Sequence, residues 1–421
     1  MIKKPYNIQI YPSVKTLHSA YKSLLQHPPE GYIFIETPKS FWAQMITYLK
    51  KIRAIQRIYQ IFTRLFNISI IVKRTNQFVT NDKDATLTLA IGNLYYNKKP
   101  WVLDLLDSPY SISSSLSFDK YTSFVANKNT TSKLVIANED IASNYLYKLF
   151  LSNKKKITKV LQSNYCKAIL CPHETALHFM KKNFPKDVVL KTKLLRHAVE
   201  LPKHVIRKKH SNVQILFMGS INNPDDFYFK GGLITIRTFL KLKDQFPNIN
   251  LVIRCKIPSE LKQEVENIPS IKIIEQELSR ESLLQIYKQS DILLLPSRVF
   301  VLMTFLESMA YGLPIVALDT YAVHDYLRNN YNAFVVSLKH LSANQDSADS
   351  INFWRPGSIK ELQTYDTLLV ERLAKKTALL IKNPVLRQRF GDHGRQRATT
   401  IFSIKTRNRK LKNIFDHALK N

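Results

Sequence analysis

The chain has 421 residues, a length that suits two domains better than a single hydrophobic core. Hydrophobic residues make up 45% and charged residues 23%, a mix that excludes a mainly disordered protein. Lys and Arg number 63 against 32 Asp and Glu, and the formal net charge of +31 favours anionic partners such as nucleic acid, acidic lipid or phosphorylated substrates. The three cysteines are too few and too scattered for a disulfide framework or a zinc site.

Short β-branched and apolar runs alternate with helical stretches along the chain. In the first half they predict strands at 8–11, 32–36, 68–73, 86–91, 101–106 and 133–137. In the second half they predict strands at 213–218, 250–255, 271–275, 292–296 and 314–318. Such alternation indicates α/β domains built on parallel sheets. The basic segment 201–211 predicts a domain boundary, and 403–419 predicts a basic amphipathic helix that caps one of the domains.

The stretch 41–66 mixes aromatic and basic residues at helical spacing and contains no acidic residue. Three interpretations stay open: a helix lying on anionic lipid, a core helix with a solvated basic face, or a nucleic-acid surface. We do not expect nucleic acid, because no recognition motif accompanies the charge.

The start of the chain lacks the features of an export signal or a membrane anchor. Residues 1–15 are basic but contain no apolar segment of the kind found in secretory signals. No apolar run reaches the roughly 20 residues that span a bilayer. We therefore expect a cytoplasmic protein, and the lipid interpretation of 41–66 would place it at the inner face of the membrane.

The segment after the strand predicted at 213–218 has the character of a phosphate-binding turn. The strand runs into Gly219 and Ser220, and after a polar loop a helix opens at Lys230 and Gly231. Parallel α/β sheets bind ligands at the carboxyl ends of their strands. The free N–H groups of a helix N-terminus suit a phosphate, glycine lets it approach the backbone, and the lysine supplies positive charge. The alternative is an ordinary loop with a solvated lysine.

A helix predicted over 301–311 is apolar on nearly all sides and is closed by Gly312, with Pro314 just beyond. Glu307 lies inside this helix. A carboxylate in such surroundings is costly unless it is paired or hydrogen-bonded. Two ribose hydroxyls would satisfy it, and so would an Arg or Lys from elsewhere in the fold.

The stretch 307–315, Glu-Ser-Met-Ala-Tyr-Gly-Leu-Pro-Ile, resembles the donor-binding signature of the retaining glycosyltransferases of family 4, of the glycosyltransferase group 1 type. Those enzymes have the GT-B fold, and their donor domain also carries a Lys-Gly helix start like that at 230–231. Further motifs of the family are matched in the same order by YCKAILCP at 165–172, LRHAV at 195–199 and the stretch 330–335. The resemblance covers roughly residues 160–400.

The resemblance implies an α/β protein of GT-B fold, with two Rossmann-like parallel-sheet domains facing each other across a cleft. We expect an acceptor-side domain over 1–200, a nucleotide-sugar-binding domain over 201–402 and a C-terminal helix over 403–421. The implied activity is a hexosyltransferase in polysaccharide or glycolipid synthesis. It would move a sugar from a nucleotide sugar to a glycan or lipid-linked acceptor, with retention of anomeric configuration. No cofactor and no metal are implied, because protein cations neutralise the diphosphate.

Carried over by position, the family's donor site corresponds to Gly219, Ser220, Lys230, Gly231, Glu275, Leu302, Met303, Thr304 and Glu307. The resemblance implies that Lys230 neutralises the diphosphate and that Glu307 holds the ribose hydroxyls. The backbone of 302–304 would face the phosphates, and the loop that contains Glu275 would lie near the base.

Four positions depart from the family pattern, one of them Leu302, which stands where the family has glycine at the start of the helix. At the other three, Val299 stands in place of the first of two glutamates, Leu106 in place of a histidine, and Ser220 in place of a basic residue. Asp107, next to Leu106, is the candidate catalytic carboxylate, and its other interpretation is a cap of the turn before Pro109. These departures motivate an alternative function, a catalytically impaired GT-B protein that binds a nucleotide sugar without transferring it.

Overall fold

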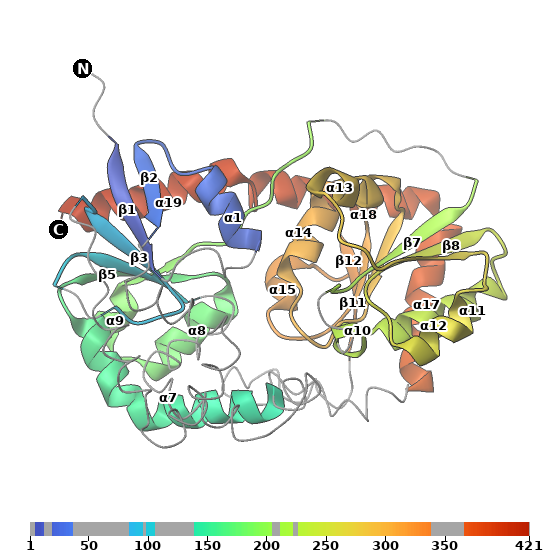
Figure 1. Cartoon of the computed structure of the whole chain (residues 1–421), viewed down its shortest axis with the longest axis horizontal. Coiled ribbons are helices and arrows are strands. Elements are labelled where there is room, and N and C mark those ends of the chain that lie inside the picture. Colours follow the sequence, from blue (N-terminus) through green and yellow to red (C-terminus); the bar gives the residue numbers. More distant parts are fainter. Residues whose placement is uncertain are drawn as a thin grey trace, which may run out of the picture. The chain divides into compact units, whose positions relative to one another are not determined.

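The computed structural model describes residues 5–11, 19–36, 84–95, 98–105, 139–203, 211–221, 226–337 and 366–420. One compact unit is formed by the described parts of Met1–Thr131, Asn144–His197 and Arg407–Asn421, and the other by those of Ser132–Ser143 and Ala198–Thr406 (Figure 1). Among the described residues, no helix has the length and apolarity needed to cross a membrane. Four predictions lie outside the described residues: the helix at 41–66, the strands at 68–73 and 133–137, and Asp107.

A six-stranded parallel sheet forms the centre of the first unit. Its strands are β1 (Tyr6–Tyr11), β2 (Tyr32–Glu36), β3 (Leu87–Ile91), β4 (Trp101–Asp104), β5 (Cys166–Cys171) and β6 (Thr192–Leu194). Their order in the sheet is β2-β1-β3-β4-β5-β6. The residues of β3, β4 and β5 are almost all buried, because a parallel sheet is covered on both faces.

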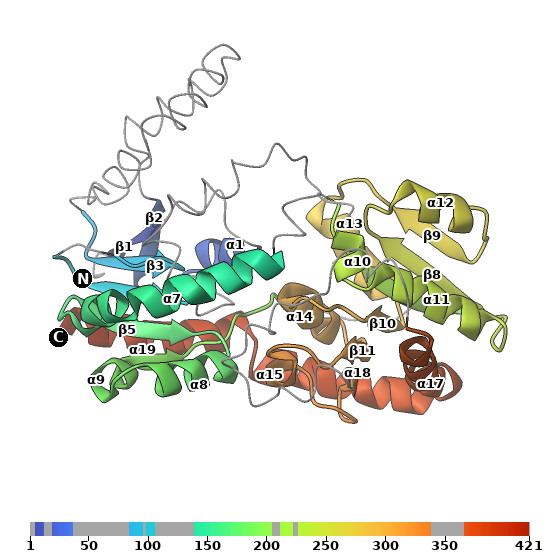
Figure 2. The same ribbon diagram turned by 90° about the horizontal axis from the view of Figure 1, so that it is seen from below.

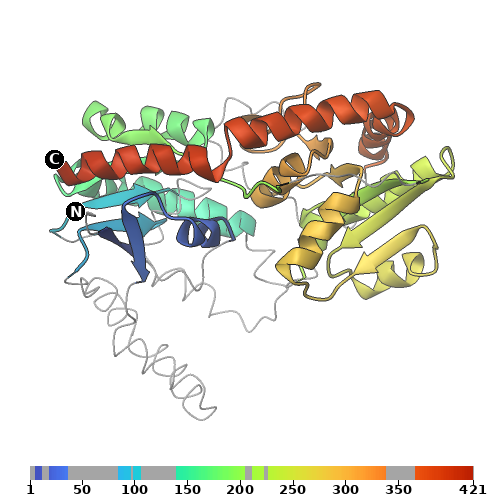
Figure 3. The same ribbon diagram turned by 90° about the horizontal axis from the view of Figure 1, so that it is seen from above.

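The helices of the first unit cover both faces of its sheet (Figures 2 and 3). They are α1 (Ser19–Gln26), α7 (Glu139–Gln162), α8 (Glu174–Asn183), α9 (Lys186–Leu190) and α19 (Ile404–Lys420). Side chains of α7, α8 and α9 pack with Trp101 and Leu103 on one face. Side chains of α1 and α19 pack with Val102 on the other, as the alternation of a strand requires.

The C-terminal helix α19 confirms the amphipathic helix predicted at 403–419, and it belongs to the first unit. Phe415 packs edge-on against Tyr32 of β2, whose hydroxyl donates to Asp416. The buried guanidinium of Arg407 donates to the carbonyl oxygen of His27 over 3.0 Å, and burial lowers the pKa of this arginine to about 10. These contacts attach the end of the chain to its beginning.

The second unit contains a second six-stranded parallel sheet. Its strands are β7 (Val213–Met218), β8 (Ile249–Arg254), β9 (Ile271–Ile274), β10 (Ile292–Leu295), β11 (Ile315–Leu318) and β12 (Ala333–Val336). Their order is β12-β11-β10-β7-β8-β9, so the chain starts near the middle of the sheet, extends it to one side and then returns to extend it on the other.

The helices of the second unit are α10 (Asp226–Phe229), α11 (Gly232–Lys243), α12 (Ser259–Val265), α13 (Arg280–Gln289), α14 (Leu302–Ala310), α15 (Val323–Tyr326), α17 (Thr367–Lys382) and α18 (Pro384–Thr400). Helix α17 packs on α11 and on β10, β11 and β12, and α14 packs on α18. Helix α14 ends as predicted at Gly312, which has a φ of 67° and donates to the carbonyl oxygen of Met309.

Every strand predicted within the described residues is present, with ends that differ by at most two residues. Strand β12, at the edge of the second sheet, was not predicted as a strand, and β5 was matched only as a family motif at 165–172. The three-residue strand β6, at the edge of the first sheet, was not predicted either. Its sequence, Thr-Lys-Leu, is too short to show a periodic pattern. In the structure the two units divide between His197 and Ala198, shortly before the boundary predicted at 201–211.

Candidate functional site

The order of the second sheet creates a switch point between β7 and β10. From β7 the chain continues through β8 and β9, whereas β10, β11 and β12 extend the sheet on the opposite side. The connections that follow the two strands leave in opposite directions, and the crevice at their carboxyl ends is where open α/β sheets bind ligands. The residues that follow β7 and β10 are therefore expected to form a binding site.

Gly231 lies at this switch point, immediately before α11. Its φ is 78°, in the left-handed region that favours glycine. A Cβ on Gly231 would overlap the carbonyl oxygen of Pro296, the residue after β10, and would lie 2.8 Å from its carbonyl carbon. The start of α11 thus rests directly against the end of β10, and only glycine permits this contact.

Two neighbouring glycines are required by close packing. A Cβ on Gly219 would collide with the Sγ atom of Cys255, and one on Gly232 would collide with the ring of Phe227. Cys255 is buried, its thiol donates to the carbonyl oxygen of Ser220 over 3.2 Å, and burial raises its pKa to about 12. Packing alone therefore accounts for these glycines, whereas the predicted approach of a ligand to the backbone stays a prediction.

Lys230 is the cation of this turn and is half-buried. Within the described residues, no ion pair joins its ammonium group to a carboxylate. Burial lowers the pKa of Lys230, with the carboxylate of Asp226 opposing this shift and the guanidinium of Arg254 adding to it. An ammonium group in such surroundings is stabilised by a bound anion. The free N–H groups at the start of α11 favour an anion at the same place.

Glu307 lies on α14, and its side chain is only 8% exposed. Arg280 of α13 pairs with its carboxylate and is itself 50% exposed. The hydroxyl of buried Tyr287 hydrogen-bonds both Glu307 and Thr304, and burial, together with the charge of Glu307, raises the pKa of this tyrosine well above its usual value. Of the two partners that the sequence left open, the cation is thus present. A carboxylate offers about four acceptor sites, so Arg280 and Tyr287 leave room for further donors.

Glu275 follows β9, and its carboxylate already has partners within the same unit. Its carboxylate accepts from the N–H group of Ile257 over 3.0 Å and pairs with Lys262 over 2.5 Å. Burial raises the pKa of Glu275, but these two partners outweigh it and the pKa is lowered. The proximity of this loop to a nucleotide base stays a prediction.

The chain after β10 leads from the glycine turn to α14. The N–H group of Arg298 donates to the carbonyl oxygen of Phe229 over 2.9 Å, and Val299 packs against the ring of Phe229. At the start of α14 the side chain of Leu302 is buried, whereas those of Met303 and Thr304 are half-buried. Val301, the residue before α14, makes no side-chain hydrogen bond to the free N–H groups at the start of this helix.

Three residues of this region were not predicted from the sequence: Arg254, Arg280 and Tyr287. Arg254 is the last residue of β8, and a basic residue at a strand's carboxyl end was a signal that could have identified it. Arg280 and Tyr287 belong to α13, which contains no motif, and only the folded chain brings them to α14.

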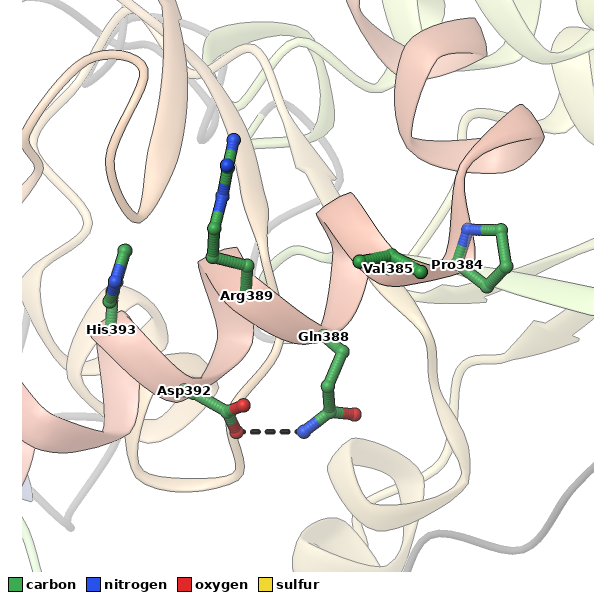
Figure 4. A pocket seen from close by; sticks show the side chains of 6 residues that line it. All are labelled: Pro384, Val385, Gln388, Arg389, Asp392 and His393. Atoms are coloured by element: carbon green, nitrogen blue, oxygen red, sulfur yellow. Dashed lines mark hydrogen bonds between the residues drawn. The ribbon is translucent and has the colours of Figure 1, made fainter.

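A surface pocket of about 550 Å³ lies elsewhere in this unit, on α18 (Figure 4). Its walls are formed by Pro384, Val385, Gln388, Arg389, Asp392 and His393. The ring of His393 stacks on Tyr331 with 3.9 Å between the centroids. None of the predicted donor-binding residues lines this pocket. Within the parts of the chain that the structure describes, no group of three or more His, Cys, Asp and Glu side chains could hold a metal ion.

Comparison with known sequences identifies the type of domain that contains these residues. Residues 212–351 match the sequence model of a family described as Glycosyl transferases group 1. The matched segment includes all six strands of the second sheet and both the Lys230 turn and Glu307. No curated protein sequence matches the chain.

Solved structures resemble the chain over its whole length. HepE of Anabaena, in complex with UDP, shares 12% identity with a TM-score of 0.54, covering 98% of this chain and 99% of that one. A glycosyltransferase from Rickettsia africae shares 13% identity with a TM-score of 0.53, covering 100% of both chains. TarM of S. aureus shares 13% identity with a TM-score of 0.48 over 83% of this chain, which spans 58% of TarM. The chain therefore has the GT-B fold, and its second domain is similar to the group 1 glycosyl transferases.

Proposed function

We propose that this protein is a glycosyltransferase that moves a sugar from a nucleotide-sugar donor to an acceptor hydroxyl. The observation that carries the proposal is Lys230, half-buried and without an ion pair among the described residues, at the start of α11 and beside the switch point of the sheet. The match of residues 212–351 to group 1 glycosyl transferases supports it. The UDP complex of HepE supports a nucleoside diphosphate as the anion.

In the proposed reaction the bond between the anomeric carbon and the donor phosphate breaks, and negative charge grows on the leaving diphosphate. Lys230 and the first N–H groups of α11 would stabilise that charge without reorganisation. Glu307, held by Arg280 and Tyr287, would accept hydrogen bonds from the ribose hydroxyls. The sugar is a hexose transferred with retention to a glycan or lipid-linked acceptor. Asp107, outside the described residues, is our candidate for the carboxylate that assists the transfer.

A second candidate function is binding of a nucleotide sugar without transfer. The observation that favours it is Val299, an apolar residue that packs on Phe229 where a carboxylate would be needed to contact the donor sugar. Turnover separates the two functions. A panel of nucleotide sugars would first be screened for thermal stabilisation, because a ligand that binds the folded state raises its apparent stability. Release of sugar from a stabilising donor would establish an enzyme, whereas stabilisation without any release would favour the binding protein.

The first prediction is that a nucleoside diphosphate binds without added metal. Protein cations and helix N–H groups are sufficient to neutralise the diphosphate at the Lys230 turn. Calorimetric titration with and without a chelator should give the same dissociation constant. Loss of binding in chelator would contradict the metal-independent site, provided that the chelator leaves the melting temperature of the free protein unchanged.

A second prediction concerns Glu307→Gln, which keeps the shape of the side chain and removes its charge. Because Arg280 is 50% exposed, water can solvate it when the pair is lost. We therefore expect Glu307→Gln to lower the free energy of unfolding by only about 1 kcal/mol, or the melting temperature by about 2–4 °C. Affinity for the donor should fall by about tenfold or more, because a neutral amide accepts weaker hydrogen bonds from the ribose.

Glu264→Gln is the matched control for this variant, because Glu264 also pairs with an arginine, Arg237, on the surface of the same unit. It should leave donor affinity unchanged. A Glu307→Gln protein that melts far lower yet binds and transfers normally at low temperature would make Glu307 a structural residue only.

A third prediction is that the protein sediments with anionic vesicles but not with neutral ones, and that binding fades as salt rises. The motive is the stretch 41–66, which is basic, aromatic and free of acidic residues. Replacing Lys50, Lys51 and Arg53 together with Ser should reduce sedimentation with anionic vesicles.

The control for the vesicle experiment is the equal loss of charge from Lys154, Lys155 and Lys156 of α7. If both triple variants lose binding equally, the attraction is a property of net charge. If the variant at 50–53 binds as well as the wild type, the stretch 41–66 is not the membrane contact.

A further inference from the structure

Arg254 lies at the carboxyl end of β8, beside the same turn as Lys230. In the sheet it is paired with Met218 of β7 and with Ile274 of β9. Its Nη1 atom lies 3.4 Å from the carbonyl oxygen of Gly219, the first residue after β7. The guanidinium therefore reaches over the edge of the sheet at which the proposed diphosphate site lies.

The charge of Arg254 has no carboxylate partner within the described residues, and its Nε atom is buried without a hydrogen-bond partner there. Arg237 of α11 also has a buried Nε atom without a partner, but its charge is paired, because both of its terminal nitrogens bind the carboxylate of Glu264. A guanidinium offers five N–H donors, and burying one of them without an acceptor costs free energy. The unused donors of Arg254 are thus available to an acceptor that the free protein does not supply.

Arg254 and Lys230 also act on each other. Burial is the main cause that lowers the pKa of Lys230, and the positive charge of Arg254 adds to it, so the two cations lie close enough to repel. The carboxylate of Asp226 raises the pKa of Lys230 and so opposes the effect of Arg254. Asp226 forms no ion pair with either cation in the described structure. Two like charges held together in this way are relieved by an anion that carries more than one negative charge.

We infer that Arg254 is a second cationic ligand of the diphosphate, binding it together with Lys230. A guanidinium can donate two parallel hydrogen bonds to one phosphate, whereas the ammonium of Lys230 acts as a point charge. The inference rests on the proposed function, because it assigns a residue to the site at which the donor diphosphate binds.

The test uses two probes, inorganic pyrophosphate and UDP, titrated into the full chain by calorimetry. Pyrophosphate reports on the phosphate contacts alone, without any base or ribose. Arg254→Ala should weaken binding of both probes by about tenfold or more. The affinity of Arg254→Lys for both probes should fall between those of the wild type and Arg254→Ala. Lysine keeps the positive charge but cannot donate two parallel hydrogen bonds as a guanidinium does. Arg237→Ala, a matched arginine whose charge is already paired, should bind both probes as the wild type does.

The outcomes separate this inference from the function on which it rests. If Lys230→Ala loses affinity and Arg254→Ala does not, Arg254 is outside the site and the proposed function stands. If the wild type binds neither probe nor any other nucleoside diphosphate, both proposals are overturned. Where Arg254→Ala melts well below the wild type, Arg254→Lys decides the matter. Wild-type affinity for both probes in Arg254→Lys would overturn the two-bond contact between the guanidinium and the phosphate on which the inference rests.

Discussion

Gly231→Ala should lower the free energy of unfolding of the second unit by about 3 kcal/mol, the largest effect on stability that we expect from a single methyl group. A φ of 78° costs about 1–2 kcal/mol for a residue with a Cβ. The added methyl also overlaps the carbonyl oxygen of Pro296, a backbone atom that cannot rotate away, and such overpacking costs about 1–3 kcal/mol. For a domain of this size the sum corresponds to about 6–12 °C in melting temperature.

Gly31→Ala separates the two contributions to this effect. Gly31 has a φ of 82°, but a Cβ built on it meets no atom within 4 Å. Gly31→Ala should therefore lower the free energy of unfolding only by the backbone cost of about 1–2 kcal/mol. Hydrogen exchange in peptides from α11 and β10 would report on Gly231, and exchange in peptides from β1 and β2 would report on Gly31. Equal losses for the two variants would show that the Pro296 contact relaxes at no cost.

Lys230→Ala should weaken binding of a nucleoside diphosphate by about 10–150-fold and leave binding of the nucleoside nearly unchanged. A hydrogen bond between a charged donor and a phosphate contributes about 1.5–3 kcal/mol. The contribution is specific to the phosphates because the lysine stands at the start of α11 beside the carboxyl end of β7. The folded protein should not be destabilised, since burial already lowers the pKa of this lysine and so disfavours its charged form.

Lys241→Ala provides the control on the same helix. Lys241 pairs with Glu371 of α17, and its loss removes the same charge from α11 without touching the turn. It should leave affinity for the diphosphate unchanged at moderate salt. If Lys230→Ala weakens the diphosphate and the nucleoside by the same factor, the lysine does not contact the phosphates and acts through the shape of the site.

The sequence was sufficient to predict the architecture of the described parts of both units. Alternation of short apolar runs with helical stretches is a local property, and the strands that it predicts are those of the two parallel sheets. The end of α14 at Gly312 was equally predictable, because left-handed termination by glycine depends on neighbouring residues only. The short edge strands β6 and β12 were missed because their pairing with β5 and β11 is not encoded in three or four residues.

The sequence predicted the strand and the helix start on either side of the Lys230 turn, but not the packing that requires Gly231. A strand followed by a glycine-rich helix start is visible in the chain itself. The collision that a methyl group would cause involves Pro296, a residue far along the chain that lies beside the turn only because β10 pairs with β7. The roles of Asp107 and of 41–66 stay predictions from sequence.

The partners of the charged residues were decided by the tertiary structure alone. The sequence showed that Glu307 needs a partner and left both a ribose and a basic side chain open. Folding places Arg280 and Tyr287 of α13 against the carboxylate and leaves Arg254 without a carboxylate among the described residues. Pairing of charges depends on distances of a few ångströms between elements remote in sequence, whereas the alternation that defines a strand or the glycine that ends a helix depends only on adjacent residues.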